Sequence, residues 1–220
     1  MQFAGLQKNS TIDYPGVLSA VLFTPGCNFD CYYCHNRHLT EENPELLDSE
    51  EIHDFLKKRR GLIGGIVISG GEASLQQDLP AFIGEVKSMG YKVKLDTNGS
   101  YPKVVEKLIQ DDLLDYIAVD YKTTLASYEA LFGFSSTNVS ATFDLIKESA
   151  VAYELRTTMI PEITPARLYE MALAYPNLRR YALQLYLPQQ EESRRIYTPG
   201  ELEELAKKIR HIQPGVIVRA

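Results

Sequence analysis

The three cysteines of this chain, Cys27, Cys31 and Cys34, all lie within eight consecutive residues. They follow a short apolar run, residues 17–23, whose composition is typical of a β-strand. Iron–sulfur clusters are held by cysteine thiolates, usually four of them. Three protein thiolates would leave one iron with an open coordination position for a substrate or cofactor. The spacing therefore favours a chemical centre over a structural crosslink.

Two other interpretations of the cysteines stay open. His38 follows Cys34 by four residues, so the three thiols and this imidazole would complete a Cys3His set for zinc. Zinc ligand pairs are usually separated by a dozen or more residues, and four ligands in so short a segment would be cramped. Alternatively the cysteines only pack in a core, as free cysteines often do. Three cysteines so close together, with none elsewhere, are an uncommon pattern for simple packing.

Length and composition indicate one ordinary globular domain over residues 1–220, with 45% hydrophobic and 24% charged residues. No apolar run approaches the length of a membrane span, and the N-terminus lacks a signal-peptide pattern. We therefore expect a cytoplasmic protein without a membrane partner, a setting in which clustered cysteines more often bind metal than form disulfides. The net charge of −6 argues against nucleic acid as a partner, because such binding depends on basic surface.

Short apolar runs alternate along the chain with longer segments of helical periodicity. Residues 6–16 are expected to be an irregular lead-in, closed by the turn signal Asp13-Tyr14-Pro15-Gly16. Strands are expected at residues 17–23, 65–69, 91–95, 116–119, 153–160 and 181–187, with 216–218 as a final short strand. Helices are expected at residues 49–60, 78–90, 102–109, 125–132, 139–150, 165–175 and 199–212. Ser49 and Asp78 are expected to cap the first two helices.

This alternation predicts an α/β protein with a parallel sheet covered by helices. A complete eight-unit barrel needs ~250 residues. Six strand–helix units in 220 residues therefore fit a partial (β/α)6 barrel with parallel strands, and the site is expected at the C-terminal ends of the strands. A doubly wound open sheet is the alternative architecture.

Polar motifs directly follow the expected strands. They are Gly70-Gly71-Glu72, Asp96-Thr97-Asn98-Gly99 and Asp120-Tyr121-Lys122, while Arg156 and Gln184 lie within the fifth and sixth strands. The carboxyl ends of parallel strands share one face of the sheet. Residues far apart in the sequence are therefore expected to converge near the cysteines.

The residue types in these motifs suit a charged ligand. Glycines let a ligand approach the backbone closely, and the Glu72 carboxylate could accept hydrogen bonds from an ammonium group. Asp96 and Asp120 could bind a ribose hydroxyl or a cation, although helix capping or turn formation would also explain them. Lys122 could meet a carboxylate. Arg156 is flanked by apolar strand residues and is expected to face a site or an ion pair, because unpaired burial would be costly.

Taken together, these motifs resemble the radical S-adenosylmethionine superfamily. The Cys-x3-Cys-x2-Cys loop, with aromatic Tyr33 before its last cysteine, matches the family signature, and Gly70-Gly71-Glu72 matches the family's Gly-Gly-Glu element. Within the superfamily, residues 12–16 and 33–37 are similar to glycyl-radical-enzyme activases. Residues 94–100 and 156–158 resemble the activating proteins of anaerobic ribonucleoside-triphosphate reductase. The similar segments run from residue 6 to about residue 187.

The resemblance implies a set of cofactor contacts. Cys27, Cys31 and Cys34 would hold a [4Fe-4S] cluster, whose unique iron is chelated by the amino and carboxylate groups of S-adenosylmethionine. The remaining assignments are Gly70, Gly71 and Glu72 for the methionyl amino group, Tyr33 near adenine, Asp96 and Asp120 for the ribose or a nearby monovalent cation, Asn98 as a further cofactor-binding residue of the Asp96 motif, and Lys122 and Arg156 for the carboxylate end.

The resemblance also implies the reaction and the partners. A reduced cluster would pass one electron to the sulfonium, giving methionine and a 5′-deoxyadenosyl radical that takes an Hα from a glycine of a partner enzyme. That glycyl-radical enzyme is expected to be anaerobic ribonucleotide reductase, with Asp13 touching its glycyl loop. No second cysteine motif is present, so the expected electron donor is an external flavodoxin or ferredoxin.

Two residues depart from the family pattern. Ala73 stands where proline often follows Gly-Gly-Glu, and Gln184 and Gln189 occupy a region where some activases carry a histidine. The adenine and ribose contacts there are therefore not carried over. The alternatives to an activase are a radical S-adenosylmethionine enzyme acting on a small molecule or peptide, and a zinc-binding non-enzymatic α/β protein. A short chain favours the open site of an activase, since enzymes for small molecules usually enclose their pockets.

Overall fold

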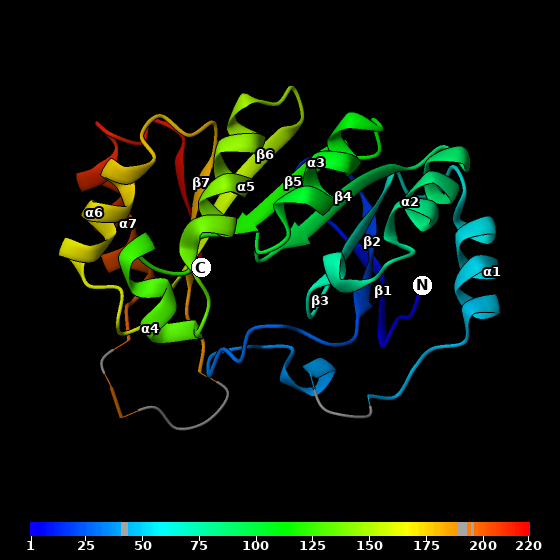
Figure 1. Cartoon of the computed structure of the whole chain (residues 1–220), viewed down its shortest axis with the longest axis horizontal. Helices are drawn as coiled ribbons and strands as arrows, with labels where there is room; N and C mark the ends of the chain where they lie inside the picture. The colour runs from blue at the N-terminus through cyan, green and yellow to red at the C-terminus, as the bar shows by residue number, and fades with distance from the viewer. Residues whose placement is uncertain (41–43, 189–192, 195) are drawn as a thin grey trace.

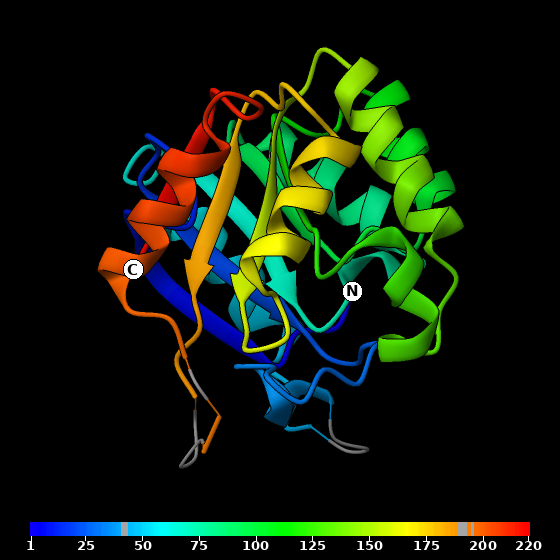
Figure 2. The same ribbon diagram turned by 90° about the vertical axis from the view of Figure 1, so that its left-hand side faces the viewer.

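The computed structural model describes residues 1–40, 44–188, 193–194 and 196–220, and it shows one curved sheet with helices outside it (Figures 1 and 2). The eight strands of these residues pair in the order β1 to β8. Strands β2 to β8 are parallel. The strands are β1 Gly5–Ser10, β2 Ser19–Thr24, β3 Gly65–Gly70, β4 Lys92–Thr97, β5 Tyr116–Asp120, β6 Ala152–Met159, β7 Tyr181–Leu185 and β8 Val216–Arg219. The predicted α/β class and parallel sheet are confirmed.

Strand β1 corrects the expected irregular lead-in. It runs antiparallel to β2, with Leu6 opposite Leu22 and a register shift between Gln7 and Ser10. Its central side chains, from Gln7 to Asn9, are exposed polar groups. Because β1 lies at the edge of the sheet, it needs few apolar side chains and lacks the alternation that marks a strand in a sequence.

The helices lie where the periodicity predicted them, to within a few residues. They are α1 Ser49–Arg59, α2 Leu79–Ser88, α3 Pro102–Gln110, α4 Tyr128–Phe132, α5 Ser136–Glu148, α6 Pro165–Ala174 and α7 Pro199–Ile209, with short 3-10 helices η1 Arg37–Thr40, η2 Ala73–Leu75 and η3 Leu125–Ser127. None of the described helices is long and apolar enough to cross a membrane.

The predicted cap of α1 is wrong by one residue, whereas Asp78 does stand at the N-cap of α2 but makes no side-chain cap bond. The cap of α1 is Asp48, whose carboxylate accepts a 2.8 Å hydrogen bond from the backbone N–H of Glu50, and Ser49 is the first helical residue. Aspartate caps a helix as well as serine does, so the preceding residue takes the position. Asp78 makes no side-chain cap bond because its carboxylate pairs with the N-terminal ammonium of Met1.

The two faces of the sheet carry different side chains. The outer face packs against the helices in one large hydrophobic core. The inner face holds a small apolar cluster, in which Tyr14 and Tyr116 pack with Val21 and Val67. Strands β1 and β8 end the sheet without pairing to each other, so the barrel is open. The open inner face has room for polar groups that a closed barrel would fill with branched apolar side chains.

Candidate functional site

A cavity of about 380 Å³ lies at the C-terminal ends of the strands. It brings together the three cysteines and nearly all the motif residues predicted from the sequence. Its lining includes Asp13, Cys27, Cys31, Tyr33, Cys34, Gly70, Gly71, Asp96, Asn98, Asp120, Lys122, Arg156 and Gln184. Glu72 is not among these lining residues, and Gln189 lies outside the described part of the chain.

The cysteine loop follows β2 and crosses the end of the sheet beside α4 (Figures 1 and 2). Phe29 anchors it, since its ring stacks on Phe132 of α4 with the centroids 5.5 Å apart. Burial raises the pKa of the Cys27 thiol to about 11 and also raises that of Cys31. The backbone N–H of Phe29 donates to Cys27 Sγ at 3.4 Å and works in the opposite direction, towards a thiolate. A metal binding here would displace protons from the thiols.

The predicted zinc alternative has no preformed counterpart. Among residues 1–40, 44–188, 193–194 and 196–220, no three His, Cys, Asp or Glu side chains are grouped to hold a metal ion. His38 is exposed in η1 and does not line the cavity, whereas His35 does. A cluster differs from a single ion in this respect, because each thiolate binds a different iron and the thiols need not converge on one point.

The two glycines of the Gly-Gly-Glu motif place β3 directly against the start of the cysteine loop. A Cβ atom on Gly71 would lie 1.8 Å from the carbonyl oxygen of Gly26, and one on Gly70 would lie 2.3 Å from the backbone nitrogen of Thr24. Gly70 also has a φ of +117°, which a side chain would strain. Two backbone hydrogen bonds close this contact, from Gly71 N–H to Thr24 O at 2.9 Å and from Glu72 N–H to Gly26 O at 2.8 Å.

The Glu72 carboxylate is fully buried and is used inside the protein. It accepts hydrogen bonds from the backbone N–H groups of Ser74 at 3.0 Å and Asn98 at 2.6 Å. The hydroxyl of Thr97 donates to it at 2.8 Å, and the hydroxyl of Ser74 also donates to it. Burial raises the pKa of Glu72, while these donors favour the ionised form. The carboxylate thus ties the loop after β3 to the loop after β4, and the backbone of Gly70 and Gly71 is what this motif offers to the cavity.

Asn98 connects the loop after β4 to the cysteines. Its amide nitrogen donates to Asn28 Oδ1 at 2.8 Å and lies 3.9 Å from Cys27 Sγ. Its amide oxygen accepts from the backbone N–H of Ser100 at 3.0 Å, and Asn28 Nδ2 donates to the Ser100 hydroxyl at 2.9 Å. The Asp96 motif therefore holds the cysteine loop in place as well as lining the cavity.

Two carboxylates and three cations form a continuous chain of ion pairs along the inner face of β4, β5 and β6. Arg156 bridges the acids, with NH1 2.9 Å from Asp96 Oδ2 and NH2 2.9 Å from Asp120 Oδ1. Lys122 Nζ lies 3.0 Å from Asp120 Oδ2, and Lys94 pairs with Asp96 Oδ1. All four carboxylate oxygens already accept a bond from a cation, so a monovalent cation beside Asp96 and Asp120 would have to share them.

The charged groups in this series of ion pairs stabilise one another's ionised forms. Burial by itself would raise the pKa of Asp96, but the nearby charges of Arg156 and Lys94 outweigh it and lower the pKa to about 2. Burial opposes ionisation of Asp120 too, and the cations Lys122 and Arg156 lower its pKa. Asp120 in turn raises the pKa of Lys122 against the effect of burial. Asp96, Asp120 and Lys122 therefore stay ionised at neutral pH. By formal charge, the three bases in this series of ion pairs exceed its two acids by one.

The remaining predicted residues frame this charged region. Lys122 Nζ lies 6.0 Å from the centre of the Tyr33 ring, on the cysteine loop. Asp13, from the turn before β2, and Gln184, on β7, reach the cavity from the opposite ends of the sheet. The sequence therefore predicted residues of seven separate segments that line one cavity.

The sequence prediction assigned no individual role to several residues of the cavity and its ion pairs. Ser69, Thr97 and Thr158 also line the cavity, and Ser69 Oγ donates to Asp96 Oδ2 at 3.2 Å. Lys94 and Thr158 each lie two positions from a predicted site residue on the same strand, Asp96 and Arg156. Side chains two positions apart in a strand share a face of the sheet. This two-residue period is the sequence signal that could have identified Lys94 and Thr158.

Comparison with known proteins agrees with this geometry. The Radical SAM superfamily profile matches residues 21–174. A Methanocaldococcus jannaschii protein whose name places it among glycyl-radical enzyme activating enzymes is 36% identical over 98% of this chain and 95% of its own length. The pyruvate formate-lyase-activating enzyme of Streptococcus mutans is 26% identical over 80% of this chain and 73% of its own length.

The fold is also found in solved structures. A radical SAM methyltransferase from Sphaerobacter thermophilus superimposes with a TM-score of 0.73 at 14% identity, covering 94% of this chain and 67% of the methyltransferase. At that identity the likeness shows the fold alone. The profile match over most of the chain and the relative that is similar over nearly its full length show that this chain is an enzyme of the radical SAM superfamily.

Proposed function

We propose that this protein is a single-domain activase that cleaves S-adenosylmethionine at a [4Fe-4S] cluster and generates a glycyl radical in anaerobic ribonucleoside-triphosphate reductase. The observation that carries the proposal is the meeting of three thiols and a fixed chain of charges in one cavity. The relative named as an activating enzyme supports the activase assignment. Residues 94–100 and 156–158 support the choice of reductase.

The donor set of the cavity fits the cluster. Cys27, Cys31 and Cys34 line the cavity. Two of its carboxylates, Asp96 and Asp120, are neutralised by Arg156 and its neighbouring lysines, and the third, Asp13, accepts a hydrogen bond from the Ser10 hydroxyl. The protein thus offers three thiolates, and Asp96 and Asp120 are already paired with cations, which suits a cluster with one iron left for the cofactor. When bound, the reduced cluster supplies one electron to the sulfonium, whose S–C5′ bond breaks to give methionine and a 5′-deoxyadenosyl radical.

The chain's own residues would bind and orient the cofactor. The excess positive charge of the chain of ion pairs suits the methionyl carboxylate, with Lys122 and Arg156 as its partners. The backbone of Gly70, against Thr24, and of Gly71, against Gly26 beside Cys27, suits the amino group next to the cluster. Glu72 would act through the loops that it joins, and Tyr33, which lines the cavity, would cover adenine. These are binding and positioning roles, since the cofactor supplies the chemistry.

The substrate in this proposal is a protein loop. Asp13 lines the cavity from the turn before β2 and would contact the backbone of the entering glycyl segment. The cavity forms on an open barrel, because β1 and β8 remain unpaired to each other. The proposed electron donor is a flavodoxin or ferredoxin, and the proposed location is the cytoplasm, where such donors act. A monovalent cation sharing the oxygens of Asp96 and Asp120 would make cofactor affinity depend on potassium, which replacement by choline would reveal.

The test has two stages under anaerobic conditions. The protein is reconstituted with iron and sulfide, reduced, and given S-adenosylmethionine, and 5′-deoxyadenosine is measured. The reductase from the same source is then added, and its glycyl radical is measured by electron paramagnetic resonance. We expect both products. Release of 5′-deoxyadenosine without a radical in the reductase would redirect the proposal to a peptide or small-molecule substrate, and a tightly bound zinc without 5′-deoxyadenosine would overturn it.

A further inference from the structure

A second buried carboxylate lies on the inner face of the barrel, outside the lining of the cavity. Glu154 on β6 is 0% exposed. Arg219 on β8 binds both its oxygens, with NH1 2.9 Å from Oε1 and NH2 2.6 Å from Oε2. The hydroxyl of Tyr116 on β5 donates to Oε2 at 3.1 Å. A two-point guanidinium–carboxylate contact of this kind is among the stronger polar contacts in proteins.

Glu154 is also a rival partner for Arg156. The two residues are two positions apart on β6, so their side chains share a face and their backbones are separated by about 6.6 Å along the strand. The guanidinium of Arg156 feels the charge of Glu154 as well as those of Asp96 and Asp120. It nevertheless bonds only to Asp96 and Asp120 among the described acids, while Arg219 occupies Glu154.

We propose that Arg219 is a positioning residue for the cofactor site. By occupying Glu154, it leaves Arg156 to bridge Asp96 and Asp120 and to face the carboxylate end of S-adenosylmethionine. The inference rests on the proposed cofactor site. It assigns a role to the last strand, which carries none of the sequence motifs and whose Arg219 pairs in register with Gln184 of β7.

The count of charges in the bonded network of the inner face supports the same role for Arg219. The described acids of this network are Asp96, Asp120 and Glu154, and the described bases are Lys94, Lys122, Arg156 and Arg219. One positive charge is in excess, and a single ligand carboxylate would neutralise it. Without Arg219 that excess disappears, and the unpaired buried Glu154 becomes the strongest attraction for Arg156.

The first variant is Arg219→Met, which keeps the length of the side chain and removes its charge. We expect the affinity of the reconstituted enzyme for S-adenosylmethionine, measured by anaerobic calorimetry, to fall about tenfold, because a charged hydrogen-bonding partner is withdrawn from the ligand. A crystal structure of this variant should show the Arg156 guanidinium on Glu154. Arg210→Met, an exposed arginine at the end of α7, is the matched control and should leave affinity unchanged.

The decisive variant is the double substitution Glu154→Gln with Arg219→Met. It removes the rival charge, so affinity should return close to the wild-type value although the ion pair is gone. If Arg219→Met binds like the wild type, or if the double variant binds as weakly as the single one, the positioning role is wrong. If the wild-type enzyme itself binds no S-adenosylmethionine, the proposed function fails instead.

Discussion

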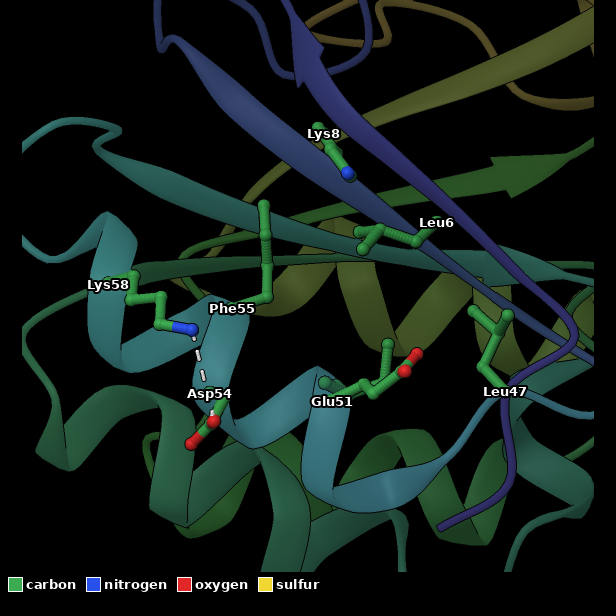
Figure 3. A pocket seen from close by; sticks show the side chains of 8 residues that line it. Leu6, Lys8, Leu47, Glu51, Asp54, Phe55 and Lys58 are labelled. Carbon is green, nitrogen blue, oxygen red and sulfur yellow. Dashed lines mark ion pairs between the residues drawn. The ribbon is translucent and has the colours of Figure 1, made fainter.

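Two hollows in this molecule differ in how deeply their charged side chains are buried. The first is the cavity at the strand ends. The second is a groove of about 510 Å³ between β1 and α1 (Figure 3). The groove has an apolar floor and a charged rim, and it is lined by Leu6, Lys8, Leu47, Glu51, Ile52, Asp54, Phe55 and Lys58. It exists because β1 extends the sheet beyond α1 without a helix of its own.

The ion pairs of the groove and of the cavity differ in how far they are exposed to solvent, and therefore in what they cost to form. In the groove, Lys58 and Asp54 are 3.9 Å apart with side chains 78% and 62% exposed. In the cavity, Arg156 and Asp96 are 2.9 Å apart with side chains 14% and 11% exposed. Exposed pairs form at little cost, whereas buried charges must be desolvated and are kept only where their geometry is well satisfied. The burial of its charges therefore favours the smaller hollow as the candidate site, whereas volume alone would favour the other.

The largest contrast should come from the cysteines. Cys31→Ala removes the most buried of the three thiols. We expect the visible absorbance of the reconstituted cluster and the release of 5′-deoxyadenosine to fall to background, since two thiolates cannot hold the cluster. His38→Ala is the control, and it should keep both signals. Loss of bound metal in the His38 variant would instead support the zinc interpretation.

The next largest effect should come from the glycine contact beside the cysteine loop. Gly71→Ala places a Cβ atom 1.8 Å from Gly26 O, which forces β3 and the loop apart. We expect the free energy of unfolding in urea to fall by about 3 kcal/mol, as in other overpacked sites. Gly84→Ala in α2 is the matched control, because its Cβ would find only Leu113 at 4.0 Å. That variant should gain up to about 1 kcal/mol from helix propensity, and equal stabilities for the two variants would contradict the close contact.

The loss of stability at low pH should depend on the buried charges of the cavity. The pKa of Asp96 is lowered from 3.8 to about 2 in the folded protein, so its stabilising contribution is present above pH ~4 and is lost as the pH falls towards ~2. Asp96→Asn should therefore cost on the order of 2 kcal/mol near neutral pH, and the difference from the wild type should shrink in acid. Urea unfolding at a series of pH values measures it.

The groove supplies the control for this experiment. Asp54→Asn removes an exposed carboxylate whose ion pair is screened by solvent, so its cost in the free energy of unfolding should be small at every pH of the series. A flat profile for Asp96→Asn would mean that the ion pairs with Arg156 and Lys94 do not hold Asp96 ionised in solution.

The sequence was sufficient for the parts of the site that follow a strand. Glycines, acids and bases after apolar runs predicted the cavity lining, because parallel strands bring their carboxyl ends to one face. Residue type did not reveal how each group is used. Glu72 was expected to face an ammonium group, and the structure shows its carboxylate bonded to backbone N–H groups on either side. Which groups a carboxylate binds depends on loops from two strands, and a linear pattern does not contain that information.

The residues deeper in the barrel were missed for a related reason. Lys94 and Glu154 precede Asp96 and Arg156 by two positions, so strand periodicity could have placed them on the inner face. Their partners lie on other strands, and Arg219 comes from β8, which was predicted only as a short final strand. Pairing across a sheet depends on strand order and register. Strand β1 was also missed, because its exposed polar residues show no alternation of apolar and polar side chains.

The smallest expected effect lies at the rim of the groove. Lys58→Ala breaks the 3.9 Å pair with Asp54, in which both side chains are mostly exposed. An exposed i,i+4 helix pair contributes about 0.3 to 0.5 kcal/mol, so the free energy of unfolding should change by less than about 0.5 kcal/mol. A double-mutant cycle with Asp54→Ala measures the coupling directly, and 5′-deoxyadenosine release should be unchanged in all three variants. A coupling energy as large as the loss of stability expected for Asp96→Asn would mean that the groove holds a desolvated charge pair in solution. The contrast in burial between the two hollows would then no longer identify the active site.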